Sequence, residues 1–188
     1  MEHQSVDETV AKAGNIYRWF GTQPQRFGKR INFFKLLFYG ALTLFCIFFI
    51  FQPNLIPISP KWVVRAAAVV GALLSAMKAW VDGYEYYSLE SGGSLCNCAL
   101  KKFDTSEVTC SQVIDAFDNH DFNFLLDAPQ KDNQPVQFEI YEDKVGKVFF
   151  MMVMAYSGTI RYAVTNVMEI SGQEYDRWTN VIHRIKNT

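Results

Sequence analysis

The strongest constraint on the fold is a pair of long apolar runs close together in the first half of the chain. Residues 31–51 (INFFKLLFYGALTLFCIFFIF) contain one charge, Lys35, near one end. Residues 62–81 (WVVRAAAVVGALLSAMKAWV) contain Arg65 and Lys78, each a few residues from an end. About 20 apolar residues cross a bilayer as a helix, and charges near the ends reach the headgroups. The runs predict a two-pass transmembrane hairpin; a buried helical hairpin in a soluble protein is the alternative.

Basic residues indicate the orientation of this hairpin. Four of them crowd the entrance of the first run, namely Arg26, Lys29, Arg30 and Lys35, whereas the short loop between the runs offers only Lys61. Cytoplasmic loops of membrane proteins carry an excess of Lys and Arg. We therefore expect an integral membrane protein, in a bacterial inner membrane or an organellar membrane, with both termini on the cytoplasmic side.

Aromatic and basic residues beside the runs are candidates for contact with lipid headgroups. Residues 5–20 predict one amphipathic helix lying at headgroup level; packing on the protein's own domain or on a partner is the alternative. Tryptophans flank the second run at positions that suit the two membrane interfaces. The predicted anchors are Trp19, Phe20, Arg26, Lys29, Arg30, Trp62 and Trp80.

The second apolar run contains two neighbouring rows of small residues at four-residue spacing. The rows are Ala68, Ala72 and Ala76, and Ala67, Gly71 and Ser75. Small residues at this spacing allow helix backbones to approach closely. One row can face the first helix, which leaves the other for lipid, for another membrane subunit or for a second copy of the chain.

Charge divides the chain at the same place as hydropathy. Residues 1–81 hold nine basic and three acidic residues, a net charge of +6, whereas residues 82–188 hold nine and sixteen, a net charge of −7. An acidic domain is unsuited to nucleic acid, which favours a basic surface. The expected organisation is an interfacial segment 1–30, the hairpin 31–81 and a soluble α+β domain 82–188.

The pattern of residues 82–188 predicts a small antiparallel sheet with a helix packed on it. The terminal segment 171–185 carries the apolar stripe of that helix. Residues 147–156 (KVFFMMVMAY) are apolar on both faces of the pleat, so they predict a central strand covered on both sides. The other expected elements are a hairpin of 84–90 with 94–103, a helix over 109–120, a strand over 122–128, and meander strands over 136–142 and 159–170.

Four residues of this domain form a weak candidate metal site: Cys96, Cys98, Cys110 and His120. Zinc takes such ligands, but its usual spacing is C-x2–4-C, not C-x-C. Free cysteine is among the most often buried residues, so packed strand cysteines are the favoured interpretation. We expect no metal and no cofactor.

The sequence contains no glycine-rich phosphate loop, nucleophile elbow, zinc-binding helix motif or dinucleotide fingerprint. Its uncovered apolar faces instead predict a non-catalytic subunit or assembly factor of a larger membrane complex, with a cytosolic interaction domain. The alternative is a membrane-anchored sensor whose cytosolic domain binds a small ligand and acts through the hairpin.

Overall fold

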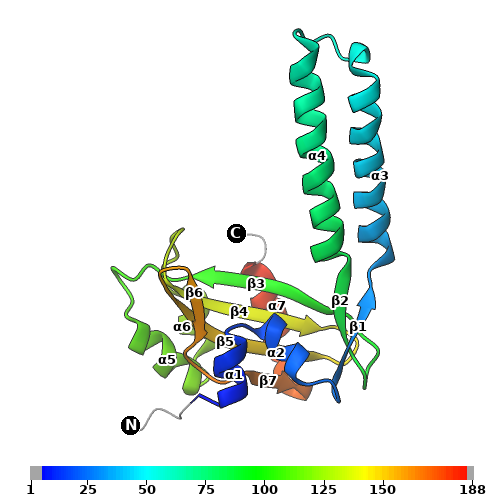
Figure 1. Cartoon of the computed structure of the whole chain (residues 1–188). Helices are drawn as coiled ribbons and strands as arrows, with labels where there is room; N and C mark the ends of the chain where they lie inside the picture. Colours follow the sequence, from blue (N-terminus) through cyan, green and yellow to red (C-terminus); the bar gives the residue numbers. More distant parts are fainter. Residues whose placement is uncertain (1–5, 186–188) are drawn as a thin grey trace. The chain divides into compact units, whose positions relative to one another are not determined.

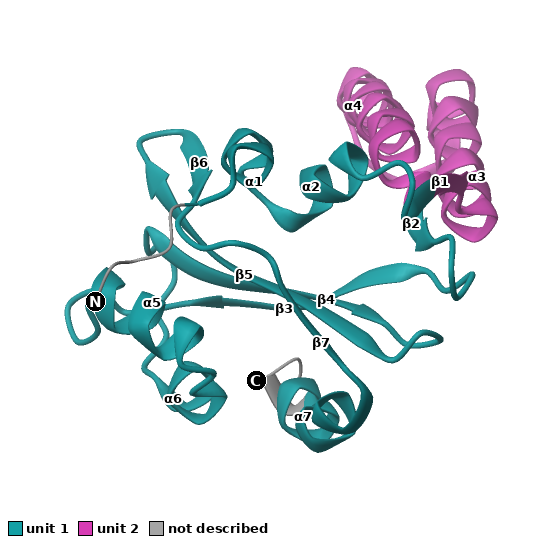
Figure 2. Ribbon diagram, turned by 90° about the horizontal axis from the view of Figure 1, so that it is seen from below, with its two compact units in different colours: residues 1–28, 86–188 teal, residues 29–85 magenta. Residues whose placement is uncertain are grey.

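The computed structural model describes residues 6–185 and divides the chain into two compact units (Figures 1 and 2). Met1–Gly28 and Tyr86–Thr188 together make the first unit, and Lys29–Glu85 makes the second. This division differs from the expected one, because the N-terminal segment folds with the C-terminal sheet and not as a separate interfacial region.

The chain is α+β, with antiparallel sheet pairing. The helices are α1 (Glu8–Ala13), α2 (Ile16–Thr22), α3 (Phe33–Phe51), α4 (Lys61–Asp82), α5 (Cys110–Asp118), α6 (Phe122–Asp127) and α7 (Gly172–Ile185), with a short 3-10 turn, η1 (Pro53–Leu55). The strands are β1 (Phe27–Ile31), β2 (Tyr84–Ser88), β3 (Leu95–Lys102), β4 (Val136–Asp143), β5 (Val148–Ser157), β6 (Ile160–Ala163) and β7 (Met168–Ser171).

The main sheet has the order β3-β4-β5-β6, and β7 also pairs with β5. β6 and β7 therefore share one edge of β5, where a single strand over 159–170 was expected. The break has a local cause: the Thr165 hydroxyl accepts a hydrogen bond from the Val153 amide at 3.0 Å, so a side chain replaces the strand backbone there.

Helices cover both faces of this sheet, as Figure 2 shows. Helices α5, α6 and α7 lie on the face that carries Phe138, Ile140 and Phe149, and α1 and α2 lie on the face that carries Phe150 and Met152. The central part of β5 is fully buried, which confirms the prediction of a strand covered on two sides. The second cover is the chain's own N-terminal segment.

The expected single helix over 5–20 is wrong over its described part, because the segment forms two short helices. Gly14 ends α1 in the left-handed conformation, with φ 71°, and Asn15 caps α2 by accepting from the Arg18 amide at 2.8 Å. A Cβ at Gly14 would lie 2.9 Å from the Arg161 carbonyl oxygen, so the position needs glycine for both its φ and its close contact.

Two predicted elements of the domain also differ. The stretch expected as a strand over 122–128 forms helix α6 (Phe122–Asp127), which Asp121 caps by accepting from the Phe124 amide at 3.1 Å. The expected hairpin of 84–90 with 94–103 is reduced to one isolated bridge, between Tyr87 and Ser94. β2 instead pairs with β1, and β3 pairs with β4.

The second unit consists mainly of α3 and α4, joined through η1 (Figure 1). Each helix is long and apolar enough to cross a membrane, with a mean hydropathy of 2.2 for α3 and 1.5 for α4 over their best 18 residues. No residue of α3, and 17% of the best 18-residue window of α4, is buried within the described structure.

Candidate functional site

The contact between α3 and α4 follows a seam that crosses both predicted rows of small residues. Val64, Ala68 and Ser75 are the buried residues of α4. The hydroxyls of Ser75 and Thr43 lie 2.8 Å apart, and interhelical hydrogen bonds of this kind contribute about 0.6–2 kcal/mol in membranes. Ala68 belongs to one row and Ser75 to the other, so neither row as a whole faces α3. The expectation that one row faces α3 and the other stays free is therefore wrong.

Gly71 belongs to this internal seam. A Cβ built on Gly71 would lie 3.0 Å from the Cys46 sulfur of α3. The remaining predicted interface residues divide around the seam: Ala72 is half-buried, and Ala67 and Ala76 are exposed.

An open apolar groove runs along one side of the hairpin, with a volume of about 780 Å³. Small residues of both helices line it: Gly40 and Ala41 of α3, and Ala76 and Ala79 of α4. A Cβ on Gly40 would meet no atom within 4 Å, so the groove is empty at that point. We call this surface the hairpin groove. A smaller hollow of about 180 Å³ is lined in part by Ala67.

The outer surface of the hairpin is strongly apolar. Phe34 is 83% exposed, and Trp62 and Trp80, near the two ends of α4, are 69% and 78% exposed. Soluble monomers rarely expose continuous apolar surface on this scale. The exposure of both tryptophans is compatible with their predicted contact with lipid headgroups.

The N-terminal anchors have a different role from the one expected. Trp19 and Phe20 are 6% and 0% exposed, because they fill the space between α2 and the sheet. The Arg26 guanidinium binds Glu169 through two hydrogen bonds of 2.6 Å, and the Arg30 guanidinium binds Glu85 at 2.9 Å. The prediction that Trp19 and Phe20 contact lipid is therefore wrong.

Lys29, the remaining basic candidate, lies over the ring of Tyr84, with its amine 4.9 Å from the ring centroid. Lys29 and Tyr84 both belong to the second unit.

The metal candidates do not gather into a site. Cys96 is exposed, Cys98 is buried and Cys110 is half-buried, while His120 follows α5 in the left-handed conformation with φ 58°. Within residues 6–185 no group of three or more His, Cys, Asp or Glu side chains has the geometry to hold a metal ion.

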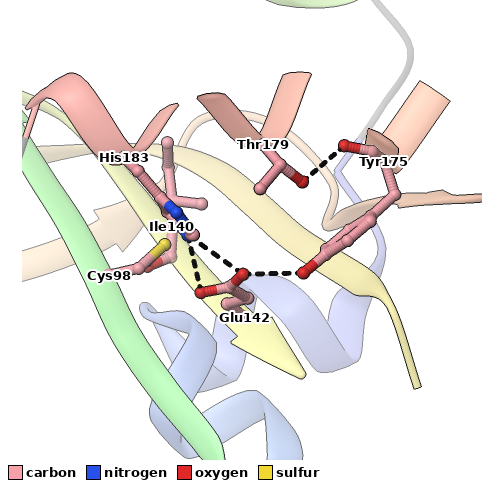
Figure 3. A network of polar contacts seen from close by, with 6 residues as sticks. All are labelled: Cys98, Ile140, Glu142, Tyr175, Thr179 and His183. Carbon is pink, nitrogen blue, oxygen red and sulfur yellow. Dashed lines mark hydrogen bonds and ion pairs between the residues drawn. The ribbon is translucent and has the colours of Figure 1, made fainter. Parts of the chain in front are cut away.

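A buried polar cluster joins β4 to α7 (Figure 3). The Glu142 side chain is 1% exposed and accepts hydrogen bonds from the Tyr175 hydroxyl at 2.8 Å and from Nε2 of His183 at 3.0 Å. The Cys98 thiol on the neighbouring strand donates to the Ile140 carbonyl at 3.5 Å. Burial, and then the hydrogen bond to Glu142, raise the pKa of Tyr175 to about 12, so the phenol stays protonated as a donor.

This cluster fastens α7 to the sheet through a charged acceptor. A buried carboxylate is costly unless hydrogen bonds satisfy it, and Tyr175 and His183 supply them from the helix. The sequence around His183 gives no indication that it binds a carboxylate. Its spacing of eight residues from Tyr175, about two helical turns, is the only signal that both could face one acceptor.

β4 carries four buried polar side chains because both of its faces are covered. Besides Glu142, Asp143 accepts from the Ser91 hydroxyl at 2.6 Å. Glu139, which shares a face with Asp143 and lies opposite to Glu142, accepts from the Ile16 amide at 3.1 Å, and burial raises the pKa of Glu139. The fourth, Gln137, has a carbonyl oxygen without a hydrogen-bond partner in the described structure.

No family model, curated protein or solved structure matches this chain. Its function is therefore argued from the geometry of the hairpin and of the sheet unit.

Proposed function

We propose that the protein is a non-catalytic, two-pass membrane subunit or assembly factor, and that the hairpin groove binds a transmembrane helix of a partner subunit. The observation that carries the proposal is the groove itself, an open apolar surface in which the small residues Gly40, Ala41, Ala76 and Ala79 lie among bulky side chains such as Leu37 and Trp80. Without a hydrophobic driving force between helices in lipid, close packing over small residues is the main source of association there.

The first unit is built from chain segments that precede and follow the hairpin, and this supports two membrane crossings. Segments on either side of the hairpin fold together, with α1 and α2 packed on β5. Two segments of one folded unit lie on the same side of a membrane, which supports two crossings over one. The basic residues before α3 favour the cytoplasmic side.

Cysteine labelling tests this topology. In a chain whose four native cysteines are replaced by alanine, a cysteine at Asn54, in the loop after α3, is expected to react with a membrane-impermeant maleimide in intact cells. A cysteine at Lys144, exposed in the turn between β4 and β5, should react only after the membrane is opened. The reverse pattern would place the domain outside, and labelling of both positions in intact cells would refute the transmembrane hairpin.

A bulky side chain in the groove tests the partner. Gly40→Leu should abolish co-purification of partner chains after extraction in mild detergent, because the new side chain extends into the groove from a position where a Cβ meets no atom within 4 Å. Membrane insertion should remain, since the change adds hydrophobicity. Size analysis and mass spectrometry of the co-purifying chains provide the measurement.

Two further variants serve as controls. Ala66→Leu places the same side chain at an exposed position of α4 that is not among the residues lining the groove, and should leave the complex intact. Gly71→Leu should disturb the packing of α3 against α4, because the new side chain would collide with Cys46. A monomeric wild-type protein, or equal complex recovery with Gly40→Leu, would contradict the proposal, and recovery of the protein's own chain alone in the complex would replace the partner by a second copy.

A further inference from the structure

A second cavity, of about 580 Å³, lies in the first unit, where the ends of β3, β4, β5 and β6 meet the loop before β4. Lys102 and Arg161 line it, and no acidic side chain is among its described lining residues. This local charge contrasts with the net charge of −7 carried by residues 82–188. A basic cavity in an acidic domain favours an anionic occupant.

Gln137 lines this cavity and is only 6% exposed. Its Nε2 donates a long hydrogen bond of 3.5 Å to the Gln134 carbonyl, and its Oε1 has no partner among the described residues. Buried polar atoms are nearly always paired, because an unpaired one loses its hydration without replacement. Since so long a bond restrains the amide weakly, rotation of the side chain would present Oε1 to a donor in the cavity.

The two basic residues are available to an anion. Lys102 pairs with Asp132 at 3.4 Å, but the Asp132 side chain is 92% exposed, and such surface pairs are weak. The Arg161 guanidinium stacks over the Tyr156 ring at 5.0 Å, which orients it, and its charge also acts on the buried Glu139 carboxyl, where it opposes the rise in pKa that burial causes. Leu100 and Pro135 add apolar surface to the same cavity.

We propose that this cavity binds a small organic anion, whose phosphate or carboxylate group pairs with Arg161 and Lys102 and whose hydroxyl or amide group donates a hydrogen bond to Gln137. The volume exceeds that of a bare inorganic ion, and Tyr156, Leu100 and Pro135 contact the apolar part of the ligand. The site lies wholly in the first unit and is independent of the partner proposed for the hairpin groove.

Isothermal titration of the full chain in detergent tests this site with three probes: inorganic phosphate, citrate and sulfate. At neutral pH phosphate and citrate carry both anionic oxygens and a hydroxyl donor, whereas sulfate carries only the oxygens. Phosphate and citrate should bind in the millimolar range or tighter, and about tenfold more tightly than sulfate, the ratio that one hydrogen bond provides. Tighter binding of phosphate than of citrate indicates a phosphorylated ligand, and the reverse indicates a carboxylate.

Three variants separate the site from general charge effects. Arg161→Gln should weaken phosphate binding at least about tenfold, while Lys144→Gln, the same loss of charge at an exposed turn outside the cavity, should leave it unchanged. Gln137→Met should remove the preference for phosphate over sulfate and raise the melting temperature by about 2–4 °C, because it replaces an unpaired buried amide. Failure of all three probes to bind at millimolar concentrations, or equal effects of Arg161→Gln and Lys144→Gln, would overturn the proposal.

Discussion

Replacement of Lys29–Glu85 by a short Asn-Gly turn is expected to give a water-soluble monomer that keeps the fold of the first unit. The cut ends lie side by side: the Arg26 carbonyl accepts from the Leu89 amide at 2.9 Å, and Gly28 lies against the ring of Tyr87. A two-residue Asn-Gly turn joins adjacent antiparallel strands without strain. Removing α3 and α4 takes away the two helices that are long and apolar enough to cross a membrane.

The fragment 86–188, expressed alone, should instead aggregate or show no cooperative unfolding. It lacks α1 and α2, and therefore exposes the face of the sheet that carries Phe150, Met152 and Met154. Each large apolar side chain contributes about 1.5–3 kcal/mol when buried, and whole domains are stable by only about 5–15 kcal/mol. Circular dichroism and urea titration of the two proteins give the comparison, and a cooperative transition of equal stability in the fragment would refute the shared core.

Phe20→Ala, introduced into the protein without the hairpin, should reduce the free energy of unfolding by about 3–5 kcal/mol, the usual cost of deleting a buried phenylalanine. Phe20 is fully buried, and its ring centroid lies 5.3 Å from that of Tyr141 and 5.4 Å from that of Phe150. The variant removes these contacts and leaves a cavity between α2 and the sheet.

Arg18→Ala provides the matched control, because Arg18 is exposed on the same helix and its loss should change stability by less than about 0.5 kcal/mol. Urea unfolding followed by tryptophan fluorescence reports both variants. If Phe20 contacted lipid instead of the sheet, Phe20→Ala would leave unfolding unchanged and would weaken membrane attachment of the full chain.

Features encoded by continuous local patterns were accessible from the sequence. The apolar runs gave α3 and α4 nearly to their ends, and the doubly apolar segment 147–156 identified β5 as the central strand. The spacing of Thr109 and Gln112 is that of a capping box, and the structure contains this box at the start of α5. In each case the signal and the structure involve the same short stretch of chain.

Features that depend on distant partners were not accessible. The Ile16 amide donates a hydrogen bond to Glu139, which lies 123 positions later in the sequence. The residues around Ile16 and Glu139 do not indicate this contact. Trp19 and Phe20 have the amphipathic character of a membrane-surface helix, and the same character suits a helix that packs on a sheet. The candidate sites could not be predicted for the same reason. Gln137 and Glu142 are unusual only because they are buried, and their burial follows from the helices that cover both faces of β4.

The discontinuous first unit also sets an order of events during synthesis. Helices α1 and α2 leave the ribosome first, but β5, on which they pack, follows more than a hundred residues later. The hairpin emerges in between, so its two helices can enter the bilayer before the sheet exists. Until β5 is synthesised, Phe20 and its neighbours have no sheet to pack on, and exposed apolar side chains of this kind make an unfinished chain prone to aggregation.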